Sequence, residues 1–127
     1  NYRLFRYADA ILMMAECYCR LDDLSSAQKY LNITRTRAGV DPLPYSTQDE
    51  MMSNIMDERA RELAGELHRK WDLVRWGIWF DQVYNCNDLS KLKNLMLPCH
   101  EYYPIPDKEV ALSGGVLTNE AYEKYQM

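Results

Sequence analysis

The first part of the sequence alternates apolar and polar residues with the period of an α-helix. Within residues 7–21, apolar side chains recur three and four positions apart and fall on one face: Ala8, Ile11, Leu12, Ala15, Tyr18 and Cys19. Residues 25–38 predict a second helix. Ser25 and Gln28 have the spacing of a capping box at its start, and Gly39 suits a left-handed end.

A third helix is predicted after Ser46, where Thr47 and Glu50 again have capping-box spacing. Its expected buried positions are Met52, Ile55, Met56, Ala60, Leu63 and Leu67. Gly65 is expected to bend or divide this helix, because glycine is a poor helix former. The helical pattern resumes over residues 71–84 as a single stretch.

The remaining sequence predicts mostly loops. We expect a loop over residues 85–97, a turn at residues 112–115 and a short helix over residues 119–125. The first two helices have the proportions of one tetratricopeptide-like hairpin, with small, aromatic and apolar residues at that repeat's offsets (Ala15, Tyr18, Ala27, Leu31 and Thr34). The predicted fold is therefore all-α, with tetratricopeptide-like helical hairpins and long irregular loops, as one domain over residues 1–127.

Composition narrows the function classes. Apolar residues make up 47% of the 127 positions and charged residues 27%, which is typical of a globular protein. The net charge of −4 argues against a nucleic-acid partner. The longest apolar run, residues 10–15, is far shorter than the roughly 20 residues that span a bilayer.

A charged stretch over residues 58–77 is the most informative part of the chain. Glu58, Glu62 and Glu66 recur every four residues, so their carboxylates share one helix face. A carboxylate pair for acid–base chemistry or a metal is one interpretation. We favour ion pairing along the same helix, with Glu58–Arg61, Arg59–Glu62, and Glu66 to Arg69 or Lys70. Farther on, Asp72 can pair with Arg75, whose guanidinium can stack on Trp76.

Aromatic residues follow the charged stretch: Trp71, Trp76, Trp79, Phe80 and Tyr84. Exposed rings of this kind form sugar-binding platforms, but at helical spacing they more often pack in a core, which is the interpretation favoured here. His68 and His100 lack a ligand set, and pairing of Cys86 with Cys99 stays open. The sequence shows no nucleophile motif, metal-ligand spacing or phosphate loop, so we expect neither an enzyme nor a cofactor.

Five fragments, in order, resemble the SusD/RagB family of nutrient-binding outer-membrane lipoproteins. They comprise Arg6 to Glu16, Leu31-Asn32-x-x-Arg35-x-Arg37-Ala38-Gly39, a central block, Pro104-Ile105-Pro106, and Asn119 with Tyr122. The central block contains Glu58, Arg59, Glu62, Arg69, Asp72, Arg75 and Trp76. One departure is Leu67, where the family usually has glycine, so the break between two helices is in question there.

The resemblance implies a role for the whole protein in nutrient uptake. Such a lipoprotein is held at the outer membrane of Bacteroidetes by an N-terminal lipid and passes oligosaccharides to a SusC-like TonB-dependent transporter. This chain would be the C-terminal portion, supplying helical scaffold and no assigned ligand residue. The signature residues would then be structural: Glu58, Arg59, Glu62, Arg69, Asp72, Arg75, Trp76, Pro104 and Pro106. The alternative is a helical-repeat module that binds a peptide or partner chain.

Overall fold

A computed structural model describes residues 5–89 and 96–125, in which every regular element is a helix. The all-α prediction is therefore confirmed. The chain divides into two compact units, Asn1–Arg69 and Lys70–Met127. The expectation of one domain over residues 1–127 stays a prediction, and the two units are described separately. No helix in the described part has the length and apolar character required to cross a membrane.

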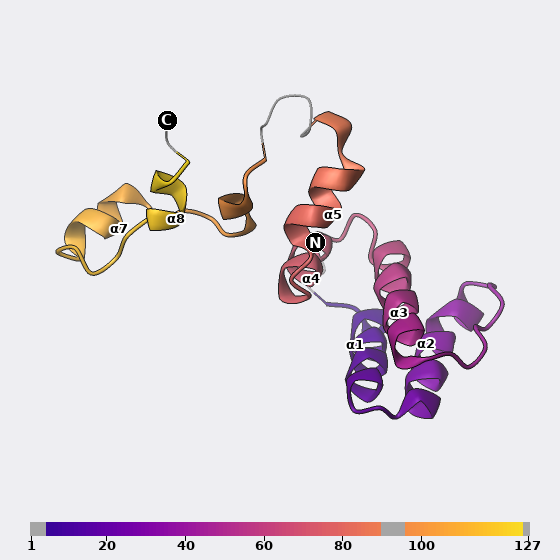
Figure 1. Ribbon diagram of the computed structural model, residues 1–127. Coiled ribbons are helices and arrows are strands. Elements are labelled where there is room, and N and C mark those ends of the chain that lie inside the picture. The colour runs from indigo at the N-terminus through magenta and orange to yellow at the C-terminus, as the bar shows by residue number, and fades with distance from the viewer. Residues whose placement is uncertain (1–4, 90–95, 126–127) are drawn as a thin grey trace. The chain divides into compact units, whose positions relative to one another are not determined.

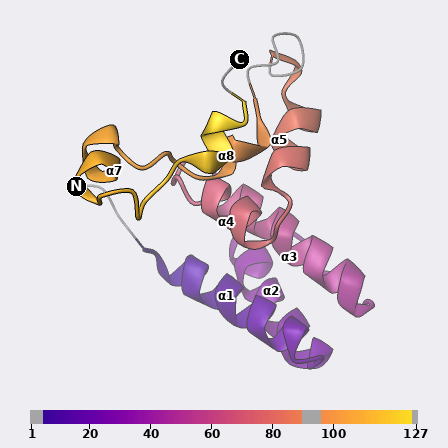
Figure 2. The ribbon, with the colours of Figure 1, turned by 60° about the vertical axis from the view of Figure 1, so that its left-hand side comes forward.

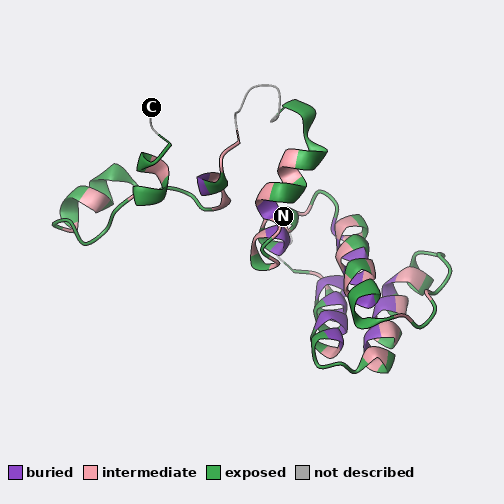
Figure 3. Ribbon diagram, in the orientation of Figure 1, coloured by how far each residue is buried: buried purple, intermediate pink, exposed green. Residues whose placement is uncertain are grey.

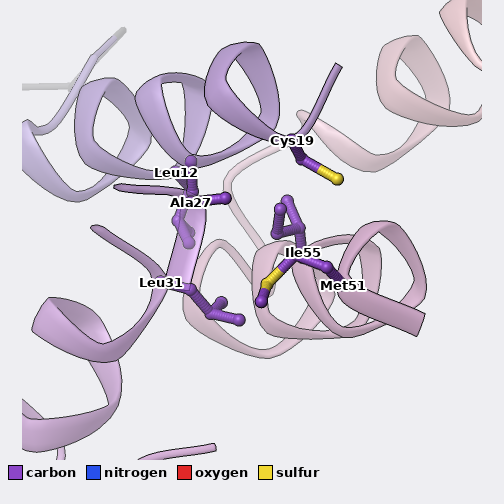
Figure 4. Close-up of a cluster of buried hydrophobic side chains, with 7 residues drawn as sticks. Leu12, Cys19, Ala27, Leu31, Met51 and Ile55 are labelled. Carbon is purple, nitrogen blue, oxygen red and sulfur yellow. The ribbon is translucent and has the colours of Figure 1, made fainter. Parts of the chain in front are cut away.

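The first unit contains three helices: α1 (Tyr7–Arg20), α2 (Leu24–Arg37) and α3 (Gln48–Glu62). They lie beside one another in both views (Figures 1 and 2). Their shared core consists of Leu12, Ala15, Cys19, Ala27, Leu31, Met51 and Ile55 (Figure 4). Ala15 and Ala27 are fully buried in the contact between α1 and α2. Their small side chains let the two helix backbones approach closely. The rings of Tyr18 and Tyr30 stack across this contact at 5.4 Å.

The start of α2 differs from the prediction. Asp23, and not Ser25, is the N-cap: its carboxylate accepts a hydrogen bond from the backbone N–H of Ser26. The bonds from Ser26 lower the pKa of Asp23, because they stabilise the ionised carboxylate. The capping-box spacing of Ser25 and Gln28 therefore led to the wrong N-cap. The end of the helix is as predicted, with Gly39 at φ +72°.

The third helix begins as predicted, with the Thr47–Glu50 capping box formed. Its buried face differs in part from the predicted one. Met51, Ile55 and Leu63 are buried, whereas Met52 and Met56 are half-buried and Leu67 is exposed. The helix ends at Glu62, and the chain turns through Gly65 at φ +78°. The division expected at Gly65 is therefore present.

In the second half of the chain, α4 (Arg69–Arg75) and α5 (Trp79–Cys86) replace the single helix expected over residues 71–84. Gly77, at φ +72°, separates them, so that expectation was wrong. A 3-10 helix, η1 (Pro98–Glu101), and two short helices, α7 (Asp107–Leu112) and α8 (Glu120–Glu123), follow. Only α8 was predicted. Most of the loop expected over residues 85–97 falls on positions 90–95, outside the described residues.

Burial is uneven along the chain (Figure 3). Buried positions are concentrated on the facing sides of α1, α2 and α3. In the second unit, the buried residues among those described are Asp72, Leu73, Trp79 and Cys99. The first unit thus holds the main hydrophobic core.

Candidate functional site

Acidic residues of α3 and of the turn after it bind arginines from α2 and from the segment that precedes α1. Arg6 donates to both carboxylate oxygens of Glu66 at 2.9 Å, to the Glu62 carboxylate at 3.0 Å and to the Glu62 carbonyl at 2.7 Å. Arg37, at the end of α2, pairs with the same Glu62 oxygen. Bonding to Glu66, and then to Glu62, raises the pKa of Arg6. Glu62 therefore binds two segments that are distant in sequence, the residues before α1 and the end of α2.

Two further ion pairs join the helices. Arg35 of α2 lies 3.1 Å from the Glu58 carboxylate and also donates to the carbonyl of Asp41. Arg59 of α3 lies 2.9 Å from Asp9 of α1, and both side chains are only 4% exposed. Because these charges are shielded from water, their positions are held more firmly than those of surface pairs. The charged stretch thus connects α3 to α1 and α2.

The contacts between segments were not expected. The sequence analysis paired Glu58, Arg59, Glu62 and Glu66 along their own helix, and of those pairs Glu58–Arg61 is present at 3.8 Å. The shorter contacts run to Arg6, Arg35, Arg37 and Asp9 on other segments. The sequence analysis included these four residues in the family motifs but assigned no ion-pair partner to any of them. The sequence held one indication of these contacts: helices that are predicted to pack together each carry charged residues with no assigned partner.

Two predicted contacts in α4 are confirmed. Arg75 donates to the Asp72 carboxylate at 3.0 Å, and its guanidinium lies 4.8 Å from the centre of the Trp76 ring. Asp72 is buried and Arg75 exposed. Arg69, where α4 begins, donates to the carbonyl of Met56 at 3.2 Å. The bond from Arg69 links the start of α4 back to α3, across the turn at Gly65.

Asparagine side chains hold two Pro–x–Pro segments. In Pro104-Ile105-Pro106, the backbone N–H and C=O of Ile105 each bond to the Asn119 amide at 2.9 Å. Asn32 holds Leu43 of Pro42-Leu43-Pro44 in the same way, at 2.8 and 3.0 Å. Proline has no N–H, and it keeps the preceding residue extended. The middle residue therefore presents one donor and one acceptor, which a primary amide complements.

A cationic side chain lies among aromatic rings in the second unit. The Lys70 ammonium is 3.9 Å from the centre of the Tyr103 ring, and 5.5 and 5.7 Å from those of Trp79 and Trp71. Trp79 is buried, whereas Trp71 is 53% and Tyr103 is 72% exposed. Phe80 stacks on Tyr84 within α5. The aromatic segment is therefore mixed, with Trp79 packed inside and Trp71 facing solvent.

A hollow of about 460 Å³ is formed by residues 98–125, and its lining is rich in tyrosine. Tyr102, Tyr103, Tyr122 and Tyr125 contribute rings to it, and the Tyr122 hydroxyl donates to the carbonyl of Tyr102. Sequence reasoning did not bring these rings together, because Tyr102 and Tyr103 follow η1 whereas Tyr122 and Tyr125 lie in or just after α8. The surface of the hollow is mostly apolar and carries few fixed polar groups. It is therefore suited to contact with the apolar surface of another group.

The histidines and cysteines form no reactive cluster among the described residues. His100 accepts a bond from the Leu97 N–H, and the His68 ring lies 6.4 Å from that of Phe5. All four cysteines are free in this structure. Burial raises the pKa of the Cys19 thiol. Within residues 5–89 and 96–125, no group of three or more His, Cys, Asp or Glu is placed to hold a metal ion.

Comparison with known proteins identifies the architecture. A model of the SusD family matches residues 1–122. Two relatives from Formosa agariphila, SusD-like proteins P25 and P2, are 36% and 31% identical over 95% and 94% of this chain. The chain spans about a quarter of each relative, 24% and 25% respectively.

A solved structure agrees with the sequence matches. The crystal structure of a SusD superfamily protein from Bacteroides vulgatus superimposes with a TM-score of 0.77 at 32% identity. The match covers 87% of this chain and 25% of that one. The fold, the order of its motifs and these relatives agree, and the chain belongs to the SusD family.

Proposed function

We propose that the chain is the C-terminal portion of a longer SusD-like lipoprotein that binds a nutrient, a glycan, at the cell surface. The whole protein, called the parent below, would be held at the outer membrane by a lipid and pass its ligand to a SusC-like TonB-dependent transporter. It would be a binder and not an enzyme. The residues described here would supply helical scaffold.

The observation that carries the scaffold role is the position of the family signature. Glu58, Arg59 and Glu62 each bind a segment outside α3, and their carboxylates and guanidinium are occupied by those partners. Charges that neutralise one another between helices orient the helices and leave little capacity to bind a polar ligand. In the second unit, signature residues are likewise engaged within the protein. Asp72 binds Arg75, and Asn119 binds Ile105 in the Pro104–Pro106 segment.

The test is binding of the parent to a polysaccharide panel, with the 127-residue chain measured beside it by calorimetry. We expect the parent to bind at least one glycan and the chain to bind none. Binding by the chain itself would overturn the scaffold role. Hydrolysis of the bound glycan by the parent would overturn the assignment as a binder.

A matched pair of tryptophan variants in the parent separates scaffold from ligand contact. Trp79→Ala removes a buried ring and is expected to cost about 3–5 kcal/mol of stability. Trp71→Ala removes a ring that is 53% exposed, and is expected to leave glycan affinity unchanged. Loss of affinity in Trp71→Ala at unchanged melting temperature would instead make the Lys70–Trp71–Tyr103 cluster a ligand site.

The transporter partnership has its own test. Co-expression of the parent with a SusC-like transporter is expected to yield a complex that survives detergent extraction and affinity purification. The alternative function, a helical-repeat module that binds a peptide, is favoured by a groove between α1 and α2. A parent that binds peptides and no glycan would support that alternative.

A further inference from the structure

The tyrosine-lined hollow of the second unit has no part in the proposed function. Its volume of about 460 Å³ lies within the range of roughly 300–1,000 Å³ that small-molecule sites occupy. The rings that line it belong to Tyr102, Tyr103, Tyr122 and Tyr125. A hollow of this size and composition can hold a small organic molecule, and its walls and charges indicate the chemical class of that molecule.

Hydrogen bonds within the second unit hold the walls of the hollow in place. The Tyr122 hydroxyl, on α8, donates to the carbonyl of Tyr102 and so fixes the direction of its own ring. The Asn119 amide bonds to both backbone groups of Ile105 at 2.9 Å, and these two residues also line the hollow. The bonds join α8 to the segment that follows η1. The walls are therefore positioned before a ligand binds, which lowers the entropic cost of binding.

The surroundings of the hollow are acidic. Residues 98–125 contain five Asp or Glu residues and two Lys residues, an excess of three negative charges. The Glu101 carboxylate lines the hollow itself, and it has no ion-pair partner among the residues that the structure describes. Lys124 also lines the hollow, but its side chain is exposed. Because the faces of tyrosine rings are electron-rich, the rings and the carboxylate both favour a positively charged ligand.

The second unit already holds one cation against aromatic rings, and the comparison shows which cation the hollow suits. The Lys70 ammonium lies 3.9 Å from the centre of the Tyr103 ring and 5.5 Å from that of Trp79. It also donates to the carbonyl of His100, since a primary ammonium carries three N–H donors that require acceptors. The hollow is mostly apolar, and the carbonyl of Tyr102 already accepts a bond. A cation without N–H groups leaves no donor unsatisfied there.

We propose that the hollow binds a small quaternary ammonium cation. The methyl groups of the ligand contact the rings of Tyr102, Tyr122 and Tyr125, and the Glu101 carboxylate balances its positive charge. A ligand that also carries an anionic group binds more weakly, because the segment around the hollow is negatively charged. The site is distinct from glycan binding and does not depend on the proposed function.

Choline and its uncharged carbon analogue, 3,3-dimethylbutan-1-ol, have nearly the same shape and differ in charge. Binding of each to the parent is measured by saturation-transfer difference NMR, which detects weak ligands of large proteins. We expect the Kd of choline to be on the order of tenfold lower than that of the analogue, because only the cation is attracted by the rings and the carboxylate. Phosphocholine should bind more weakly than choline. In the nitrogen-15-labelled 127-residue chain, choline should shift the amide signals of residues 98–125.

Two variants with matched controls locate the site. Glu101→Gln removes the carboxylate from the hollow and is expected to weaken choline binding about fivefold. Glu109→Gln removes the same charge from an exposed position of α7 outside the lining, and should change the Kd less than about twofold. Tyr125→Leu removes one ring and should weaken binding severalfold, whereas Tyr45→Leu, on the loop after α2, should leave it unchanged. Circular dichroism verifies that each variant is folded.

Equal binding of choline and its uncharged analogue would overturn the proposal, because the hollow would then provide apolar contact alone. So would a parent that does not bind choline. Choline binding that is unaffected by both Glu101→Gln and Tyr125→Leu would place the cation elsewhere and would also contradict the proposal. A parent that binds choline at this site but no glycan would retain this inference and contradict only the glycan-binding role.

Discussion

Leu67 has a backbone conformation that leucine adopts only at a cost. Its φ is +64°, in the left-handed region, and its side chain is 75% exposed and so gains little from packing. A left-handed L-residue costs roughly 1–2 kcal/mol relative to glycine. The turn nevertheless forms, since it lies between the Arg6–Glu66 bonds and the Arg69–Met56 bond.

Replacing Leu67 with glycine is therefore expected to stabilise the chain. The gain should be about 0.5–1 kcal/mol, since the relief of strain exceeds the greater entropy of glycine in the unfolded state. Urea denaturation followed by circular dichroism measures it. Ala64→Gly, in the same turn, is the control and should destabilise the chain; a loss of stability in both variants would contradict the strain argument.

Among the charged residues, Asp9 and Arg59 form the most buried pair. Arg59→Met is expected to cost about 3–5 kcal/mol, because it leaves the Asp9 carboxylate buried without its counter-charge. Adding Asp9→Asn should recover part of the loss. The control is Arg61→Met: its partner Asp57 is as exposed as Arg61 itself, and its contact with Glu58 is the longer one at 3.8 Å, so the expected change is below ~1 kcal/mol. Thermal unfolding distinguishes these outcomes, and equal losses for Arg59→Met and Arg61→Met would contradict them.

At the scale of elements, irregular segments are fixed where side chains complete their backbone bonding. The loop from α2 to α3 is fixed by Asn32 and Gln28, both of which donate to the carbonyl of Leu43. The second Pro–x–Pro segment repeats this arrangement with Asn119. Proline restricts each segment to an extended shape, so few side-chain bonds are needed to fix it.

Asn32→Asp tests this amide clamp with an isosteric change. The carboxylate still accepts from the Leu43 N–H, but it places an acceptor against the Leu43 carbonyl. We expect a loss of about 1–3 kcal/mol in urea denaturation at pH 7, because the carbonyl loses a donor. Asn54→Asp introduces the same charge on α3 and should cost less. Equal effects of the two variants would show that charge, and not the clamp, is responsible.

At the scale of the whole molecule, stability is expected to be distributed unevenly. The first unit contains the seven-residue core and most of the buried ion pairs, whereas the second buries Asp72, Leu73, Trp79 and Cys99 among its described residues. Local opening requires less free energy where little apolar surface is buried.

Hydrogen exchange read by mass spectrometry tests this distribution. Amides in α1, α2 and α3 should exchange the slowest in the 127-residue chain, and those in α7 and α8 the fastest. Uniform protection across both units would contradict the expected distribution.

The local pattern was sufficient to predict α1, α2 and α3. Apolar periodicity, the Thr47–Glu50 cap and Gly39 are properties of neighbouring residues, and helices form through bonds between neighbours. Short elements such as η1 and α7 carry no such pattern, and Gly77 divided a helix that the periodicity suggested was continuous. Family membership likewise followed from the order of motifs, and the comparisons agree with it.

The partners of the charged residues could not be derived in this way. Glu58, Arg59, Glu62 and Glu66 have candidate partners three and four positions away, and those pairings are equally compatible with the sequence. Packing of α3 on α1 and α2 brings Arg6, Arg35 and Asp9 close in a shielded environment, where a nearby opposite charge contributes more than at the surface. Burial within the mixed aromatic segment likewise depends on tertiary contacts, because periodicity alone does not reveal which neighbour covers a face.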